Sequence, residues 1–275
     1  SPPLQGTTSV RETNIPTGST IRGLDVGTGA SLIYPLIGTQ TYGWRFICTD
    51  TEATSIASAR QIASANALLL VDEKDDDGWI NIRLQPNKRN ILQGVLSEDE
   101  EIDFVMCNPP FYESAEAYQK ESNRKMRNLA SNRHKRQGTT TSNNHRGARN
   151  KRTGSTATTS KVGSNNFGGG ASELWYPGGE VSFISTLIRE SCTVANQCLW
   201  FSSLVSRRDN LPALLKILGS VKSDGRHPDA TVKDTRIIEM GQGQKSSSML
   251  FWSYHDRNEQ REWCKRRGWT FGNTS

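Results

Sequence analysis

A short turn, Asn108-Pro109-Pro110-Phe111, carries the clearest chemistry in this sequence. It follows an apolar run at residues 102–107 that is typical of a buried strand. The two prolines fix the backbone and donate no N–H, and each pushes the preceding residue into extended geometry. The turn is therefore rigid and rich in acceptor oxygens, with an aromatic ring beside them. Such a turn suits a planar substrate that carries an –NH2 group.

A second chemical feature is a glycine loop that contains Asp25, Gly27 and Gly29 and follows a predicted strand. Glycines let the backbone approach a ligand closely. Asp50 ends the next predicted strand, where an acid commonly binds ribose hydroxyls. A dinucleotide site would need a third glycine where the sequence has Leu32. S-adenosylmethionine needs no pyrophosphate site, so the sequence favours a methyltransferase over a dehydrogenase.

Each feature has a simpler interpretation when it stands alone. The glycine loop could be an ordinary strand-to-helix turn, Asp50 could cap the next helix, and the Asn108 turn could be a rigid surface turn. Their joint occurrence at the ends of predicted strands favours a site. Acceptors at Asn108 and Pro109 could hold the two N–H groups of an adenine amine and favour a more tetrahedral nitrogen as a bond forms. No strong general base is then required.

The elements that must position these residues alternate between strands and helices, which predicts an α/β fold with a mostly parallel sheet and helices on both faces. Asp209 is expected to cap a helix that has Pro212 in its first turn. The last two strands form an antiparallel hairpin, and a short charged helix follows His255. The predicted strands are 21–26, 45–49, 79–84, 102–107, 198–205, 234–240 and 248–254, and the predicted helices are 32–37, 51–70, 179–195 and 209–218.

The net charge of +6 is distributed very unevenly along the 275 residues. The segment 113–172 carries 12 Lys/Arg against 3 Glu, whereas the rest carries 22 Lys/Arg against 25 Asp/Glu. Within it, residues 131–164 are of low complexity and are predicted to be disordered. A concentrated basic excess favours a polyanionic partner. It could equally be a solvated loop or a nuclear-localisation patch.

Composition excludes several classes. No apolar run approaches the roughly 20 residues of a membrane helix, and no signal-peptide pattern opens the chain. The five cysteines form no Cys-x-x-Cys pair, so we expect reduced thiols in an intracellular protein and no metal site.

The sequence closely resembles the RNA adenine-N6 methyltransferases, a family that joins bacterial enzymes acting on large-subunit ribosomal RNA to eukaryotic enzymes acting on U6 small nuclear RNA. The resemblance spans roughly residues 21–254. It rests on LDVGTGASLIYPLIG at 24–38, YGWRF at 42–46, CNPPF at 107–111, ELW at 173–175, GGEVSF at 178–183, SLVSR at 203–207 and GQGQK at 241–245.

The resemblance implies a Rossmann-like class I methyltransferase with a mostly parallel seven-stranded sheet and a C-terminal antiparallel hairpin. The long insert after strand four is predicted to be disordered from its composition, and its low-complexity part departs from the pattern of the bacterial members. The resemblance also implies that S-adenosylmethionine is the cofactor and that Asn108, Pro109, Pro110 and Phe111 bind the target adenine. The family usually has Glu at the position of Asp50. The residues expected to bind the cofactor are Asp25, Gly27, Gly29, Ser31 and Asp50, and those expected to bind RNA are Arg124, Lys125, Arg127 and Lys245.

The methyltransferase domain is expected at 21–255, interrupted by the insert at 113–172. Residues 1–20 are expected to be a linker or a truncated N-terminal region, and 256–275 a C-terminal tail. The insert points to a eukaryotic, nuclear protein, although a cytoplasmic one remains an alternative. U6 small nuclear RNA is therefore the favoured target and ribosomal RNA the alternative, with the protein a monomer. More distant alternatives are a guanine-N2 methyltransferase, a protein glutamine methyltransferase and a non-catalytic RNA-binding module.

Overall fold

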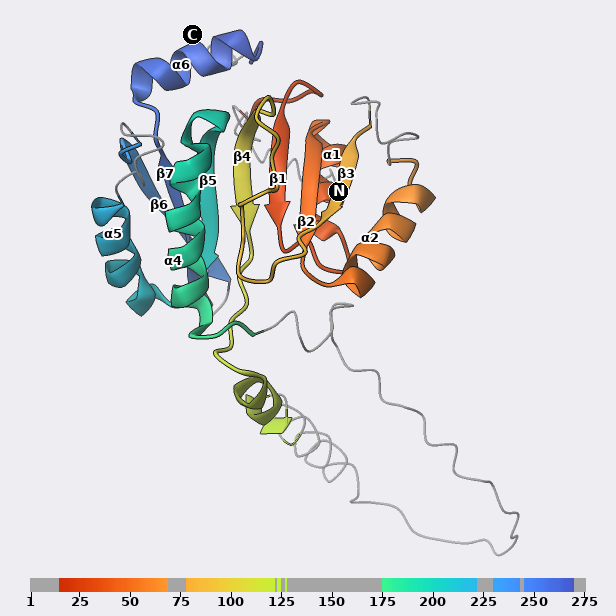
Figure 1. Cartoon of the computed structure of the whole chain (residues 1–275), viewed down its shortest axis with the longest axis vertical. Coiled ribbons are helices and arrows are strands. Elements are labelled where there is room, and N and C mark those ends of the chain that lie inside the picture. Colours follow the sequence, from red (N-terminus) through yellow and green to blue (C-terminus); the bar gives the residue numbers. More distant parts are fainter. Residues whose placement is uncertain are drawn as a thin grey trace, which may run out of the picture.

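The computed structural model describes residues 15–68, 78–121, 123, 124, 127, 175–221, 230–242 and 245–269. Seven strands and five labelled helices alternate along these residues (Figure 1). The strands are β1 (Arg22–Val26), β2 (Arg45–Asp50), β3 (Ile80–Leu84), β4 (Ile102–Cys107), β5 (Cys198–Val205), β6 (Asp234–Gln242) and β7 (Lys245–Ser253). The helices are α1 (Ile33–Tyr42), α2 (Ala53–Ala65), α4 (Gly179–Ser191), α5 (Leu211–Ser220) and α6 (Arg257–Arg266).

The strands form one sheet in the order β3-β2-β1-β4-β5-β7-β6. Strands β1 to β5 are parallel to one another, and β7 is antiparallel to both β5 and β6. The predicted fold class and C-terminal hairpin are therefore confirmed. The chain leaves β1 toward β2 on one side and returns with β4 on the other, so β1 and β4 flank the topological switch point, where open α/β sheets bind ligands.

Two apolar clusters cover the two faces of the sheet. Ile47 belongs to one cluster and its neighbours Phe46 and Cys48 to the other, because successive residues of a strand point to opposite faces. The first cluster includes apolar residues of α4 and α5, and the second includes those of α2. In sequence, each labelled helix from α1 to α5 lies between two strands, as expected for a mostly parallel sheet with helices on its faces.

The largest departures from the predicted elements concern helix ends. Asp209 was expected to cap a helix, but it lies inside a short 3-10 turn, Arg208–Asn210, and α5 begins at Leu211 without a side-chain cap. That prediction is wrong because the 3-10 turn hydrogen-bonds its own backbone before the α-helix begins. Pro212 does lie in the first turn of α5. Helix α2 ends at Ala65, earlier than predicted, where Ala67 adopts a positive φ of 52°.

Residues near both ends of the described chain pack against the sheet domain. The Trp44 indole N–H donates to the Pro16 carbonyl at 2.9 Å, and the Gly18 N–H to the Tyr42 carbonyl at 2.9 Å. Helix α6 begins with a capping box between Asp256 and Glu259. It lies across the end of the sheet where the strands begin (Figure 1). The segments expected to be a linker and a tail therefore each contribute described residues to the fold.

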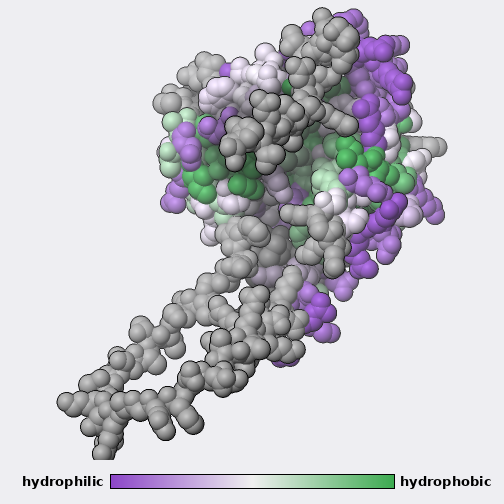
Figure 2. All heavy atoms as spheres, turned by 180° about the vertical axis from the view of Figure 1, so that it is seen from behind, coloured by the Kyte–Doolittle hydropathy of each residue, from purple (hydrophilic) through white to green (hydrophobic). Residues whose placement is uncertain are grey.

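All five cysteines are buried and free. Hydrophobic areas of the surface seen from behind are interrupted by hydrophilic ones (Figure 2). No helix in the described ranges is both long and apolar enough to cross a bilayer. Among the described residues, no three His, Cys, Asp or Glu side chains are grouped so that they could hold a metal ion.

Candidate active site

The glycine loop and the Asn108 turn follow two strands that are direct neighbours. Val26, the last residue of β1, pairs with Cys107, the last residue of β4. Because the strands are parallel, Gly27 and Asn108 leave the sheet side by side at its carboxyl edge. The structure thus brings the predicted cofactor loop and the predicted catalytic turn together.

The glycine loop is held by the neighbouring strand. The N–H groups of Gly27 and Thr28 both donate to the Thr49 carbonyl at 2.9 Å. Gly27 and Gly29 have φ angles of 70° and 65°, in the left-handed region that glycine adopts without strain. A Cβ added to Gly27 would meet nothing within 4 Å. The backbone at Gly27 therefore faces open space that a ligand could enter.

Asp25 lies beneath this loop and is 1 % exposed. Its carboxylate accepts a hydrogen bond from the Thr28 hydroxyl at 2.7 Å. Burial raises the pKa of Asp25 from its ordinary value of 3.8 to about 7; the hydrogen bond from Thr28 opposes this rise and the charge of Asp50 adds to it. In this structure Asp25 supports the loop from below, and the Thr28 hydroxyl, which carries no distinctive signal in the sequence, links the two.

Asp50 closes the other side of the loop. One carboxylate oxygen accepts from the Gly29 N–H at 2.9 Å and the other from the Glu52 N–H at 2.8 Å. Burial raises the pKa of Asp50, while these backbone hydrogen bonds lower it. Ser31 is half-buried in the turn that leads into α1. The predicted cofactor residues therefore surround one loop at the carboxyl ends of β1 and β2.

The pKa of Asp25 makes stability depend on pH. Between about pH 4 and pH 7 the folded protein keeps a proton that the unfolded chain releases, so the free energy of unfolding falls as pH rises, by about 4 kcal/mol in total. Asp25→Asn keeps an oxygen that can accept from Thr28 but has no proton to lose. Urea unfolding at pH 4 and pH 8 is expected to show a smaller decline for this variant, whereas the exposed substitution Asp99→Asn leaves the decline unchanged. Identical pH dependence in wild type and Asp25→Asn would contradict the raised pKa.

The Asn108 turn presents its ends to solvent and buries its middle. Asn108 is exposed and Phe111 is 41 % exposed, whereas Pro109 is buried and Pro110 half-buried. An exposed amide and an exposed aromatic ring flank a fixed backbone. This is the arrangement that the two prolines predict.

The segment at 175–179 contacts the residues that directly follow the Asn108 turn. Tyr112 forms an isolated parallel bridge with Trp175, and the Tyr176 N–H donates to the Tyr112 carbonyl at 2.9 Å. Gly179 has a φ of 68°, and a Cβ there would lie 3.6 Å from Glu113. The two sides of the insert are thus held together next to the Asn108 turn.

Glu180 connects two of the motifs that carry the family resemblance. It is buried in the first turn of α4 and accepts from the Ser206 N–H at 2.6 Å and the Asn210 side-chain N–H at 2.7 Å. The end of β5, beside β4, is therefore fixed by α4. An acid in the first turn of a largely apolar helix was the available sequence signal, but it does not reveal the partner.

Two of the predicted RNA-binding residues lie on a helical stretch between residues 115 and 127, which projects beyond the strand ends (Figure 1). Arg124 and Arg127 are exposed there, and Arg124 pairs with Glu121 at 3.0 Å. The Tyr118 ring packs edge-on against Tyr112, with centroids 5.4 Å apart. This stretch lines a hollow of about 490 Å³. Lys125 and the side chain of Lys245 lie outside the described residues.

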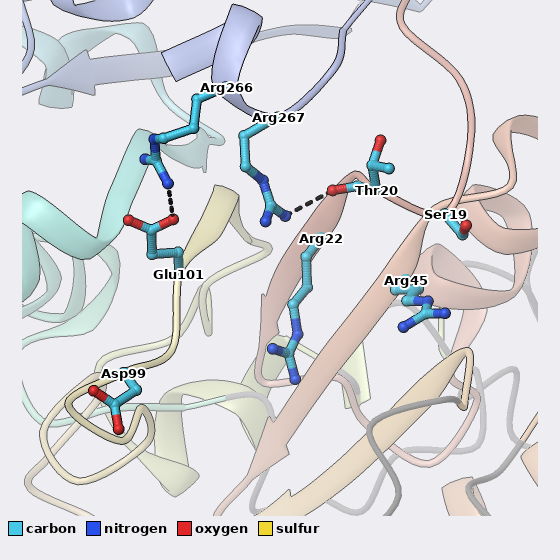
Figure 3. Close-up of a pocket in the computed structure, with 8 residues that line it drawn as sticks. All are labelled: Ser19, Thr20, Arg22, Arg45, Asp99, Glu101, Arg266 and Arg267. Atoms are coloured by element: carbon cyan, nitrogen blue, oxygen red, sulfur yellow. Dashed lines mark hydrogen bonds and ion pairs between the residues drawn. The ribbon is translucent and has the colours of Figure 1, made fainter. Parts of the chain in front are cut away.

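A second hollow, of about 540 Å³, lies at the opposite end of the sheet, where the strands begin (Figure 3). Three of the arginines that line it form ion pairs with acidic residues: Arg22 with Glu100, Arg266 with Glu101 and Arg267 with Asp103. The pairs of Arg266 and Arg267 attach the end of α6 to the sheet. We assign this hollow to structure and the carboxyl edge to function, because the chemically distinctive residues converge there.

Comparison with known proteins identifies the family of the chain. The sequence profile of an RNA methyltransferase family matches residues 7–256. Ribosomal RNA large subunit methyltransferase F of Photobacterium profundum is 39 % identical over 253 residues, which are 92 % of this chain and 67 % of that protein. The same-named protein of Pseudomonas entomophila is 40 % identical over 254 residues, with the same coverage. The chain thus spans about two thirds of these relatives.

Solved structures show the same fold. The human METTL16 catalytic domain in complex with MAT2A 3′UTR hairpin 1 is 28 % identical, with a TM-score of 0.57 over 86 % of this chain and 65 % of that one. A METTL16 methyltransferase domain lacking its N-terminal part has a TM-score of 0.53 at 23 % identity, over 86 % of this chain and 74 % of that one. With a matching profile over most of its length, the expected seven-stranded sheet and the glycine loop beside the Asn108 turn, the chain belongs to the RNA methyltransferase family, whose methyl donor is S-adenosylmethionine.

Proposed function

We propose that this protein transfers a methyl group to the N6 amine of an adenine in RNA. The observation that carries the proposal is the juxtaposition of the Asn108 turn with the glycine loop across the Val26 and Cys107 pair. The turn offers acceptors to an –NH2 group, and the loop offers space for the methyl donor. Membership of the family adds that the acceptor is RNA.

The residues present fit S-adenosylmethionine. Gly27 leaves open space where any other residue would place a side chain, and Asp50 is fixed beside the loop with both carboxylate oxygens oriented by backbone N–H groups. We infer that the backbone of Gly27 and Gly29 lies along the cofactor, with Ser31 and Asp50 holding its polar groups. When bound, the cofactor supplies an electrophilic methyl group on a sulfonium.

The catalytic turn holds and orients the amine. An adenine amino nitrogen is a weak nucleophile because its lone pair is delocalised into the ring. Acceptors from Asn108 and Pro109 hold its N–H groups and favour the more tetrahedral nitrogen that forms in the transition state. Phe111, with its exposed ring, stacks on the base. Orientation of the two reacting groups supplies much of the rest of the acceleration. A paired base must first be flipped out of its helix.

We place the target in large-subunit ribosomal RNA, which revises the expectation of U6 small nuclear RNA. The relatives at 39 % and 40 % identity are named for the large ribosomal subunit. The structural neighbour bound to an RNA hairpin is less similar, at 28 % identity; it supports a structured RNA. The expectation of a nuclear protein rested on the insert, and these bacterial relatives do not support it.

The direct test supplies S-adenosylmethionine with a radiolabelled methyl group and an unmodified large-subunit ribosomal RNA transcript, followed by digestion to nucleosides. We expect the label in N6-methyladenosine, and a U6 transcript serves as the competing substrate. Label in N2-methylguanosine, or in protein glutamine, would replace adenine as the target. RNA binding without any transfer would favour a non-catalytic module.

The 115–127 stretch should contribute to RNA affinity through phosphates. Neutralising Arg124 and Arg127 together, as alanines, is expected to reduce the slope of log affinity against log salt concentration by about 1.5, because each phosphate contact contributes roughly 0.7 to 0.9. The matched control removes Arg257 and Arg261, two exposed arginines of α6, and should leave the slope unchanged. Equal slopes for both double variants would assign the basic stretch to a solvated surface.

A further inference from the structure

Arg207 is an exposed residue at the carboxyl edge of the sheet, two residues after the end of β5. Strand β5 is parallel to β4, and Phe201 pairs with Val105. From this pair β4 continues for two residues, whereas β5 continues for four. At about 3.3 Å per residue, β5 therefore reaches roughly 7 Å further and ends level with the Asn108 turn.

The backbone of Arg207 is fixed by hydrogen bonds on both sides of it along the chain. The buried carboxylate of Glu180 accepts from the Ser206 N–H at 2.6 Å and from the Asn210 side chain at 2.7 Å. The Asn210 N–H in turn donates to the Arg207 carbonyl at 3.0 Å. The position of Arg207 at the end of β5 is thus set by α4.

The same end of α4 also contacts the segment that follows the Asn108 turn. A Cβ on Gly179, the first residue of α4, would lie 3.6 Å from Glu113. Glu180 is the next residue of the helix. The first turn of α4 therefore holds Arg207 and the continuation of the Asn108 turn in one fixed arrangement.

The Arg207 side chain has no acidic partner within the part of the chain that the structure describes, whereas its neighbour Arg208 pairs with Glu239 at 2.9 Å. A guanidinium carries parallel N–H donors that match two oxygens of a phosphate. An exposed guanidinium on a fixed backbone beside the turn for the base therefore suits the RNA backbone next to that base.

We propose that Arg207 binds a backbone phosphate of the RNA directly beside the target adenine, an inference that rests on the function proposed above. Arg124 and Arg127 lie on the 115–127 stretch, which projects away from the sheet (Figure 1), whereas Arg207 lies at the sheet edge itself. A base that is flipped into a site must be held there against the cost of unstacking. The phosphate contact holds the flipped nucleotide and touches no reacting atom.

Arg207→Ala is expected to weaken binding of a large-subunit ribosomal RNA transcript about 10-fold, the loss typical of a hydrogen bond to a charged group. The slope of log affinity against log salt concentration should fall by about 0.8, because a phosphate contact is lost. The value of kcat at saturating RNA should not change, since an interaction made equally in the ground and transition states affects KM alone. The melting temperature should not change either, because the side chain is exposed.

Two further variants separate charge, geometry and position. Arg207→Lys keeps the charge without the planar fork, so it should keep most of the salt slope. The matched control is Arg208→Ala, which removes the adjacent arginine and its surface pair with Glu239 and should leave the slope unchanged.

Phosphate ethylation interference locates the contact on the RNA. A randomly ethylated transcript is divided into bound and free fractions, and wild type should show interference at a phosphate directly flanking the methylated adenine that Arg207→Ala lacks. An unchanged salt slope for Arg207→Ala, an equal change for Arg208→Ala, or the same interference pattern in wild type and Arg207→Ala would overturn the proposal. Wild type that binds RNA with these differences between variants, but transfers no methyl group, would refute the proposed function instead.

Discussion

Replacing Asn108 with alanine is expected to lower kcat for methyl transfer to RNA by roughly 10²- to 10³-fold, the loss seen when one preorganised polar group is removed from a reacting centre. Asn108 is exposed and follows the last residue of β4, so its truncation opens no cavity. Affinity for S-adenosylmethionine and the melting temperature should therefore match those of wild type. Single-turnover transfer of a radiolabelled methyl group, with enzyme in excess over RNA, measures the chemical step.

The control for this variant is Asn66→Ala. Asn66 is an exposed asparagine at the end of α2, and its side chain donates to the Ile62 carbonyl. It should keep full activity. If Asn108→Ala also kept wild-type kcat while binding RNA normally, the turn would serve as an RNA-binding corner and the chemistry would have to reside elsewhere.

The local parts of this site could be predicted from the sequence because they depend on neighbours in the chain. Two prolines after Asn108 fix a turn wherever it lies, and Gly27 and Gly29 permit a loop that other residues would strain. Alternating apolar runs predicted the order of elements, and the family resemblance predicted the seven-stranded sheet.

Contacts between distant residues could not be predicted in this way. Glu180 accepts from the Ser206 N–H, and the Thr28 hydroxyl donates to the buried Asp25. Each partner is an ordinary residue in its own segment, and only the strand order brings the pairs together. The Asp209 cap failed for the opposite reason: the local signal was present, but a 3-10 turn used the backbone first.

The two ends of the sheet have separate tasks. The carboxyl edge carries loops and exposed polar groups, which suits ligand binding. The opposite edge carries ion pairs that attach the end of α6 to β4 and to the residue before it, including the pair of Arg267 with the buried Asp103. A substitution at the second edge should therefore affect folding without changing the chemistry.

Asp103→Ala is expected to produce the largest loss of stability, about 3–5 kcal/mol. Asp103 is 0 % exposed. Its carboxylate accepts from the Arg22 backbone N–H at 2.7 Å, from the Trp263 indole at 2.8 Å and from Arg267 at 3.0 and 3.1 Å. Removing it leaves a guanidinium and an indole N–H in a largely buried place without their acceptor, which costs more than the lost bonds themselves.

Urea unfolding and limited proteolysis together test this expectation. Since the free energy of unfolding of a domain is only about 5–15 kcal/mol, Asp103→Ala should unfold at a much lower urea concentration than wild type. Limited proteolysis should cleave α6 from this variant sooner than from wild type. Asp103→Asn retains an oxygen that can accept from Trp263 and should lose less stability than Asp103→Ala.

The control is Glu101→Ala, which removes the partner of the half-exposed Arg266 and should cost no more than about 1 kcal/mol. If Asp103→Ala were as stable as Glu101→Ala, α6 would be attached by its apolar contacts alone. The folded fraction of each variant should keep the kcat of wild type, because none of these residues lies at the carboxyl edge.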